Sequence, residues 1–73
     1  MTYVYLCARS PGERTELIPA DERANRWTHV NDLCGVLETE EKIPHSEHEV
    51  PSSRINEISN KYAGRYVAFD KVF

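Results

Sequence analysis

The segment EEKIPHSEHEVPSS, residues 40–53, holds the residue types best suited to metal chemistry. Its two histidines, His45 and His48, are three positions apart and lie among four glutamates. A zinc site needs three or four ligands, and short paired spacings of Cys or His are its strongest signature. The cysteines, at positions 7 and 34, lack that paired spacing. The sequence therefore favours an acidic loop with two exposed imidazoles over a metal site, and we expect no cofactor.

The two cysteines give little support to nucleophilic catalysis. Cys34 has His29 as its nearest histidine, but five residues on a helix separate two side chains by about 140°. With Trp27 and Val30 at helical spacing, Cys34 is better explained as a small buried hydrophobe. The sequence also lacks a glycine-rich phosphate loop. We therefore expect a protein that is not an enzyme.

Length and composition bound the remaining possibilities. A chain of 73 residues with 40% hydrophobic and 29% charged residues is typical of one small folded domain, here residues 1–73. The N-terminal apolar run has no basic residue before it and is too short for a secretory signal, and no stretch is long enough to span a membrane. Two cysteines do not indicate a disulfide-stapled secreted scaffold. We expect a cytoplasmic protein that does not bind membranes.

The first half of the chain predicts two strands and a helix. Residues 2–7 are aromatic and β-branched and run into a Pro-Gly turn, after which residues 14–19 return as a hairpin partner. Within 20–42, apolar residues recur at helical spacing: Trp27, Val30, Cys34 and Leu37. This pattern predicts a helix, with an alternative in which it breaks near Gly35 and residues 36–39 form a short strand.

The second half predicts a loop, a helix and a strand. Residues 39–52 have no apolar period and contain two prolines, which indicates a flexible acidic loop. The next segment places Ile55, Ile58 and Tyr62 on one helical face, with Ser52 or Ser53 as its N-cap and Gly64 as its left-handed C-terminal stop. In the last strand, RYVAFDKVF, Val67 and Phe69 are expected in the core. The predicted fold is α+β, β-β-α-(loop)-α-β, with the N- and C-terminal strands central in one antiparallel sheet and free to dock beside each other.

The last strand also has some features of an RNA-binding RNP1 strand, but Tyr66, Val67 and Asp70 replace key residues of that motif. We expect no direct sequence-specific nucleic-acid binding. Charge is segregated instead: residues 38–49 carry five glutamates against one lysine, and residues 50–73 carry four basic against two acidic side chains. Such segregation suits docking on a charged protein. The candidate contact residues are the arginines beside the turn and the second helix: Arg9, Arg14, Arg54 and Arg65.

From MTYVYLCARSPGER through RYVAFDKVF, the chain resembles in length and layout the small phage-encoded regulators of bacterial RNA polymerase. This resemblance implies a monomeric protein of the host cytoplasm that inhibits transcription initiation and acts as a transcription antiterminator. It also implies binding to the N-terminal region of the polymerase β′ subunit, with the elongation factor NusA as a second partner. Two alternatives stay open: another phage-type inhibitor acting by protein contact (anti-CRISPR-like, or a decoy for nucleic-acid sites), and a small metal-binding module.

Overall fold

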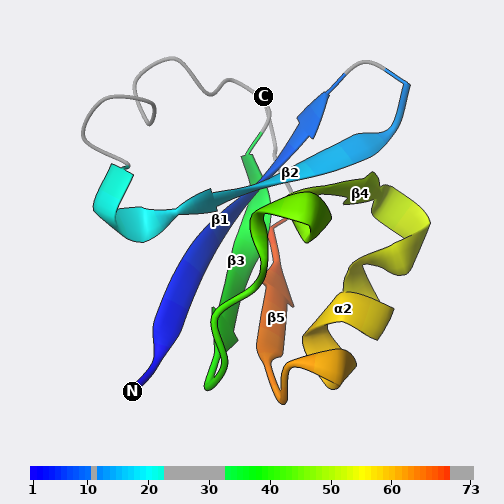
Figure 1. Cartoon of the computed structure of the whole chain (residues 1–73). Helices are drawn as coiled ribbons and strands as arrows, with labels where there is room; N and C mark the ends of the chain where they lie inside the picture. Colours follow the sequence, from blue (N-terminus) through cyan, green and yellow to red (C-terminus); the bar gives the residue numbers. More distant parts are fainter. Residues whose placement is uncertain (11, 23–32, 70–73) are drawn as a thin grey trace.

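The computed structural model describes residues 1–10, 12–22 and 33–69. Within these residues, one antiparallel sheet of five strands has the order β4-β2-β1-β3-β5, and one short helix accompanies it (Figure 1). The elements in chain order are β1 (Tyr3–Ser10), β2 (Arg14–Pro19), the 3₁₀ turn η1 (Ala20–Glu22), β3 (Leu33–Thr39), η3 (His45–Glu47), β4 (Glu49–Pro51), η4 (Ser52–Arg54), α2 (Ile55–Lys61) and β5 (Arg65–Ala68). The predicted α+β class, with strands from both ends of the chain in one antiparallel sheet, is confirmed.

The β1–β2 hairpin forms where the sequence predicts it. The second strand has the predicted bounds, and it buries Thr15 and Leu17 on one side of the sheet. The first strand is central because it is apolar on both faces: Tyr5 and Cys7 are buried on one side, and Leu6 and Ala8 on the other.

The helix predicted over residues 20–42 is wrong in its second half, where β3 pairs with β1. The apolar run LCGVL fits a strand buried on both faces as well as one side of a helix, so its periodicity alone does not separate the two. A bulge at Cys34 adds one residue between Gly35, opposite Cys7, and Leu33, opposite Ala8. The alternative break at Gly35 is closer to the structure. Trp27, His29 and Val30 lie outside the described residues.

The last strand differs from its prediction in position and in orientation. It is an edge strand beside β3, which separates it from β1. Its core-facing residue is Tyr66, whereas Val67 is 43% exposed and Phe69 is 45% exposed. The physical reason is the space above Gly35, because a Cβ there would lie 2.7 Å from the Tyr66 ring. The ring thus covers the glycine backbone, which places Val67 and Phe69 on the opposite face.

Residues 39–52 are not a loop without regular structure. They contain η3 and β4, and β4 pairs with β2 at Glu16, Thr15 and Arg14. Ile43 and Val50 are buried in the core. The Ile43 N–H donates to the hydroxyl oxygen of Tyr5 at 2.9 Å, and this contact anchors the segment to β1.

The second predicted helix is confirmed as α2, but its ends are built from other residues than expected. The residue before the helix is Arg54, and no side chain caps it. At the C-terminal end the left-handed residue is Ala63, with φ 49°, rather than Gly64. The Gly64 N–H donates to the Ser59 carbonyl and the Ala63 N–H to the Asn60 carbonyl, which is the Schellman arrangement. Gly64 is needed for space, since a Cβ there would lie 2.9 Å from the Glu38 carbonyl oxygen.

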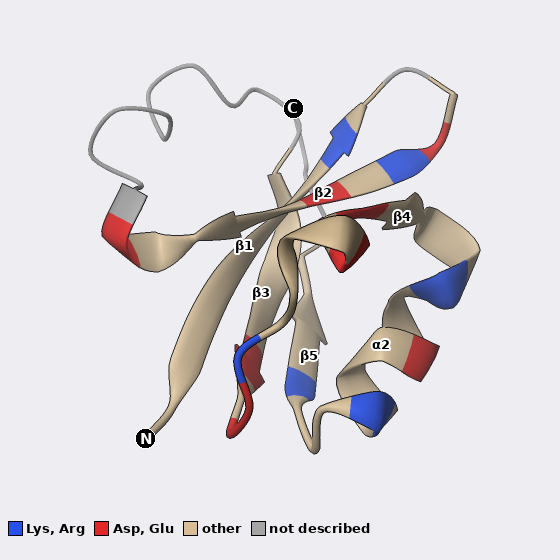
Figure 2. Cartoon of the chain, in the orientation of Figure 1, with Lys and Arg blue, Asp and Glu red and all other residues tan. Residues whose placement is uncertain are grey.

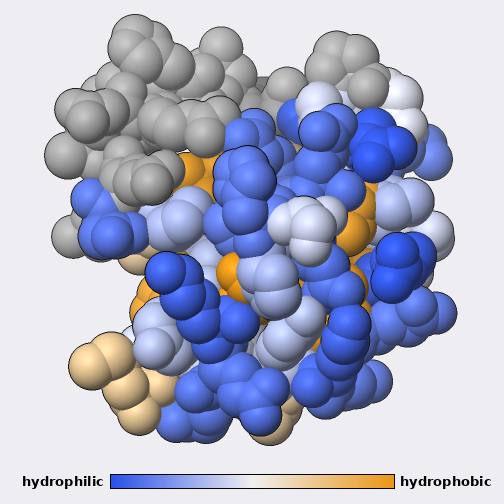
Figure 3. All heavy atoms as spheres, in the orientation of Figure 1, coloured by the Kyte–Doolittle hydropathy of each residue, from blue (hydrophilic) through white to orange (hydrophobic). Residues whose placement is uncertain are grey.

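The main core lies between the sheet and the layer made by α2 and residues 40–54. It contains Tyr5, Leu17, Leu37, Ile43 and Ile58, all at most 2% exposed. Viewed from this side, hydrophilic residues cover most of the surface, and the most hydrophobic residues show mainly in the hollows between them (Figure 3). A smaller apolar cluster of Leu6, Ala8 and Ile18, joined by Leu33 and Val36, occupies the opposite face of the sheet. Within the described part of the chain, no helix is long and apolar enough to cross a membrane.

Candidate functional site

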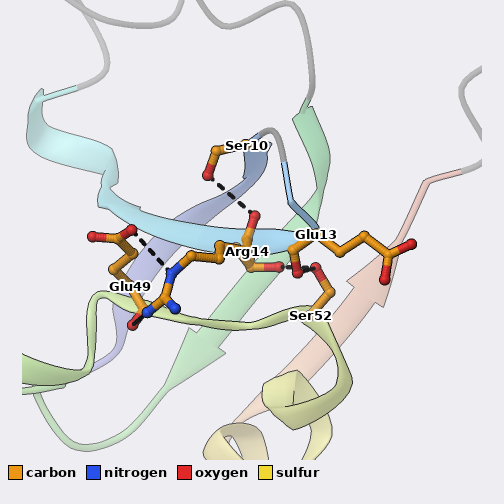
Figure 4. A network of polar contacts seen from close by, with 6 residues as sticks. Ser10, Glu13, Arg14, Glu49 and Ser52 are labelled. Carbon is orange, nitrogen blue, oxygen red and sulfur yellow. Dashed lines mark hydrogen bonds and ion pairs between the residues drawn. The ribbon is translucent and has the colours of Figure 1, made fainter.

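The β1–β2 turn carries two of the four candidate arginines and is bound to distant parts of the chain. Gly12 and Glu13 both have positive φ, 87° and 60°, which reverses the chain between Ser10 and Arg14. The Glu13 carbonyl oxygen accepts two hydrogen bonds from Ser52, one from its N–H at 2.9 Å and one from its hydroxyl at 2.6 Å (Figure 4). The turn is therefore fastened to η4, which follows it by 39 residues.

Arg14 takes part in the same network. Its Nε donates to Glu49 Oε1 at 3.0 Å and its second guanidinium nitrogen to the Glu49 carbonyl at 3.3 Å (Figure 4). The Ser10 hydroxyl donates to the Arg14 carbonyl at 3.3 Å. Arg14 thus joins β2 to β4, and Glu49 offsets its charge. Both side chains are about half exposed or more, so this ion pair contributes little to stability by itself.

Arg9, like Arg65, makes no side-chain hydrogen bond or ion pair with another described residue. It is exposed near the end of β1, opposite Thr15, and it has no ion pair with another described residue. Arg54 is exposed at the end of η4, directly after the segment that binds the turn, and its Nε lies 3.3 Å from Glu57 Oε2. These two arginines and Arg14 therefore lie around one structural feature, the β1–β2 turn and its contact with η4. We call this feature the braced hairpin.

Arg65 does not belong to the braced hairpin. It begins β5, opposite Glu38 of β3, at the other end of the molecule from the β1–β2 turn (Figure 1). Figure 2 shows that the basic and acidic segments alternate over several elements rather than forming one charged face. The charge segregation visible along the sequence is therefore not a segregation in space. The pairs Arg14–Glu49 and Lys61–Glu47 explain much of the difference, because each joins a basic residue to the acidic segment.

The two histidines lie together but are occupied by structural contacts. Their ring centroids are 5.1 Å apart, and the His48 ring also meets Tyr5 edge-on at 5.6 Å. His48 Nε2 lies 3.2 Å from the Ile43 carbonyl oxygen, so this nitrogen carries the proton and donates. Among the residues that the structure describes, no three His, Cys, Asp or Glu side chains gather closely enough to hold a metal ion.

An open pocket of about 720 Å³ lies beside the histidines, between the start of β1, the end of β2 and residues 42–48. Tyr3, Tyr5 and Pro44 give it an apolar lining, and Lys42 and His45 add polar groups at its border. No sequence pattern indicates this pocket, because its walls come from three segments that are far apart along the chain.

The acidic segment is also tied to α2 through Glu47. Lys61 Nζ donates to Glu47 Oε1 at 2.7 Å, and the Tyr62 hydroxyl donates to Oε2 at 2.5 Å. The hydrogen bond from Lys61, followed by that from Tyr62, lowers the pKa of the Glu47 carboxyl below its ordinary value. Glu47 is thus held ionised as a bridge between η3 and the end of α2.

Both cysteines are buried in the main core. Burial, with a smaller effect of Cys34, raises the pKa of the Cys7 thiol to about 12. A thiol with so high a pKa is a poor nucleophile near neutral pH. Cys34 lies in β3, not on the helix that the sequence predicts, and its sulfur is 3.8 Å from the Tyr66 hydroxyl.

Comparison with known proteins gives no relative: no family model, no curated protein and no solved structure matches this chain.

Proposed function

We propose that this protein is a non-enzymatic regulator that acts by binding another protein, and that its partner is bacterial RNA polymerase in the host cytoplasm. The expectation of this partner, of transcription inhibition and of antitermination comes from the resemblance described above. The observation that supports protein binding best is the braced hairpin: an exposed turn fixed by hydrogen bonds from Ser52 and bordered by three arginines. A binding loop that is already fixed loses less conformational entropy on association.

The three arginines are not equivalent in this proposal. Arg14 and Arg54 already face Glu49 and Glu57, whereas Arg9 has no ion pair with a described residue. An arginine that has no ion pair within the described part of the chain is available to a carboxylate on the polymerase, which it can bind through two parallel hydrogen bonds. We therefore assign the main contact to Arg9 and a supporting role to Arg14 and Arg54. Arg65 also has no ion pair with a described residue, but we assign it the smallest effect because it lies far from the braced hairpin.

Titration of core RNA polymerase with fluorescently labelled protein tests the proposal. Arg9→Ala is expected to weaken binding. If Arg9 is desolvated in the interface, its truncation costs about 2–5 kcal/mol of binding free energy; if it lies at the rim, the substitution mainly changes the on-rate and its salt dependence. Arg65→Ala is the matched control, because it removes the same charge at the far end of the molecule. The double variant His45→Ala, His48→Ala is expected to bind like wild type if it stays folded by circular dichroism.

The titration distinguishes the partner from the site. No binding of the wild-type protein at micromolar polymerase rejects RNA polymerase as the partner. If the wild-type protein binds but Arg65→Ala weakens binding more than Arg9→Ala does, the polymerase remains the partner and the braced hairpin is rejected as the contact. A metal-dependent rise in melting temperature on adding zinc would favour the metal-binding alternative instead.

A further inference from the structure

The outer edge of β5 carries backbone hydrogen-bonding groups that pair with no strand in residues 1–10, 12–22 and 33–69. In the pairing of β5 with β3, the Phe69 N–H donates to the Cys34 carbonyl at 2.8 Å. Successive residues of a strand point their N–H and C=O groups to opposite sides, so Phe69, Val67 and Arg65 face β3. Tyr66 and Ala68 therefore direct their N–H and C=O groups outward, where no other described strand pairs with them.

The two edges of the sheet differ in how they are protected. At one edge, β4 has three residues, ends in Pro51 and carries the Arg14–Glu49 ion pair. Proline, charge and short length are the usual means of preventing an edge strand from pairing with another chain. At the other edge, residues 66–69 have the sequence Tyr-Val-Ala-Phe, with neither a charge nor a proline. The β5 edge is therefore the one open to a further strand.

An apolar strip runs along the same edge. Val67 in β5 and Phe69, the residue directly after β5, are large hydrophobic residues that are exposed, at 43% and 45%. Val36 lies opposite Val67 on β3 and packs against the cluster formed by Leu6, Ala8 and Ile18. The strip thus continues the apolar face of the sheet out to its unpaired edge.

We propose that β5 of one copy pairs antiparallel with β5 of a second copy, about a two-fold axis at Val67, to form one continuous ten-stranded sheet from two five-stranded sheets. This register places Tyr66 of one copy opposite Ala68 of the other. Because both residues direct their backbone groups outward, each of the two equivalent pairs forms two hydrogen bonds. The two Val67 side chains meet at the axis, on the same face as both Phe69 side chains.

The positions of Arg65 and Phe69, two residues to either side of Val67, suit a second copy as the occupant and select this register. With the axis at Val67, Arg65 of one copy lies opposite Phe69 of the other, where its guanidinium can contact the ring. The two Arg65 residues are then four residues apart along the strands, about 13 Å at the rise of a strand, which exceeds the ~8 Å screening length at physiological salt. A two-fold axis at Tyr66 would halve the distance between the two Arg65 residues, and fewer outward-facing N–H and C=O groups would form hydrogen bonds.

The pairing involves one short strand from each copy, so the interface is at the small end of specific interfaces and its dimer is expected to be reversible. The monomer expected from the sequence is then the form present in dilute solution. The inference is independent of the proposed polymerase contact, because the braced hairpin lies on other elements.

Sedimentation of the full chain over a range from micromolar to millimolar concentration tests the proposal. The weight-average mass is expected to rise from 8.4 kDa towards twice that value as the concentration increases. Ala68→Pro removes the outward N–H but not a bond to β3, and is expected to keep the mass at the monomer value throughout. Ala68→Ser is the matched control, since it retains the N–H, and is expected to dimerise like wild type.

A second variant covers the case in which Ala68→Pro does not fold. Val67→Lys changes an exposed side chain and places two like charges at the axis, so it is also expected to remain monomeric. Circular dichroism of each variant establishes its folding. A wild-type protein that stays monomeric up to millimolar concentration overturns the proposal, and so does a folded Ala68→Pro or Val67→Lys variant that dimerises as wild type does.

Discussion

Ser52 and Glu13 form a contact that joins the β1–β2 turn to the second half of the chain. The N–H and the hydroxyl of Ser52 both donate to the Glu13 carbonyl oxygen, at 2.9 and 2.6 Å, across 39 residues of chain. The same hydroxyl lies 2.9 Å from Oγ1 of Thr15, a residue that is only 2% exposed. One serine therefore fixes the β1–β2 turn, satisfies a buried hydroxyl and positions the start of η4.

Ser52→Ala is expected to destabilise the protein by about 1–3 kcal/mol, because it leaves the buried Thr15 hydroxyl without its partner. Ser53→Ala is the matched control, since Ser53 is exposed and is the neighbouring serine. Urea denaturation followed by circular dichroism measures both free energies of unfolding. Equal values for the two variants would contradict the role assigned to Ser52.

The end of α2 predicts a pair of glycine effects of opposite sign. Ala63 has φ 49°, a conformation that costs a non-glycine residue about 1–2 kcal/mol. Ala63→Gly removes this cost but gives the unfolded chain more conformational entropy, so the net stabilisation expected is roughly 0.5–1 kcal/mol. Gly64→Ala is expected to destabilise, because its Cβ would lie 2.7 Å from Thr39 Cγ2 and 2.9 Å from the Glu38 carbonyl oxygen. Thermal unfolding of both variants checks the prediction. A stabilising Gly64→Ala would show that Gly64 is not in close contact with β3.

Stability is expected to fall in alkali because of Cys7. Burial raises its pKa from 9.0 to about 12, so the unfolded chain releases the thiol proton first as the pH rises. The contribution of the Cys7 thiol to the free energy of unfolding is fully present below pH 9 and is lost as the pH rises from 9 to about 12. Between these values the free energy of unfolding falls with a slope approaching about 1.4 kcal/mol per pH unit. The measurement is the free energy of unfolding against pH for wild type and Cys7→Ala.

The Cys7→Ala variant is compared by slope rather than by absolute stability, because it also removes core volume. Burial, followed by smaller effects of Cys34 and Cys7, raises the pKa of the Tyr66 hydroxyl as well. Tyr66 is present in both proteins, so the difference in slope contains the effect of Cys7 itself and its smaller effect on Tyr66, both in the same direction. Identical slopes above pH 9 would contradict the raised pKa of Cys7.

Stability is expected to fall in acid through Glu47, whose pKa is lowered by hydrogen bonds from Lys61 and Tyr62. A lowered pKa means that the unfolded chain takes up the proton first, so this contribution is present above the ordinary value of 4.5 and is lost as the pH falls through the lowered value. Glu47→Gln is expected to melt at a lower temperature than wild type at pH 7 and to approach it at low pH. A constant difference in melting temperature between pH 7 and pH 3 would contradict the prediction. Glu41→Gln, at an exposed position, serves as the control.

The elements that the sequence predicted well are those with a local cause. The bounds of β2 follow from alternating apolar residues between a turn and Pro19, and α2 follows from Ile55, Ile58 and Tyr62 at helical spacing. The segment 33–39 was mistaken for helix because it is apolar on both faces, and only its pairing with β1 distinguishes a strand from a helix there.

The candidate site was predictable only in part. The exposure of the four arginines follows from their positions beside turns and helix ends, but their partners do not: Glu49 and Glu57 take two of them, and Arg65 is at the opposite end of the molecule from the β1–β2 turn. The sequence predicted two exposed imidazoles in a flexible loop; His45 is exposed, but His48 is partly buried. The ring of Tyr5 and the carbonyl of Ile43 that hold His48 come from the folding of the chain around it.

The amino-acid sequence by itself determined the class of this domain, because residue periodicity and turn residues act over a few positions. Tertiary structure alone decided the strand order and which side of β5 faces the core. Both depend on contacts between distant residues, above all the Tyr66 ring over Gly35, and a shift of one position in strand register exchanges the two faces of a strand. Val67 and Phe69 are exposed for that reason, although their sequence pattern suits a core strand equally well.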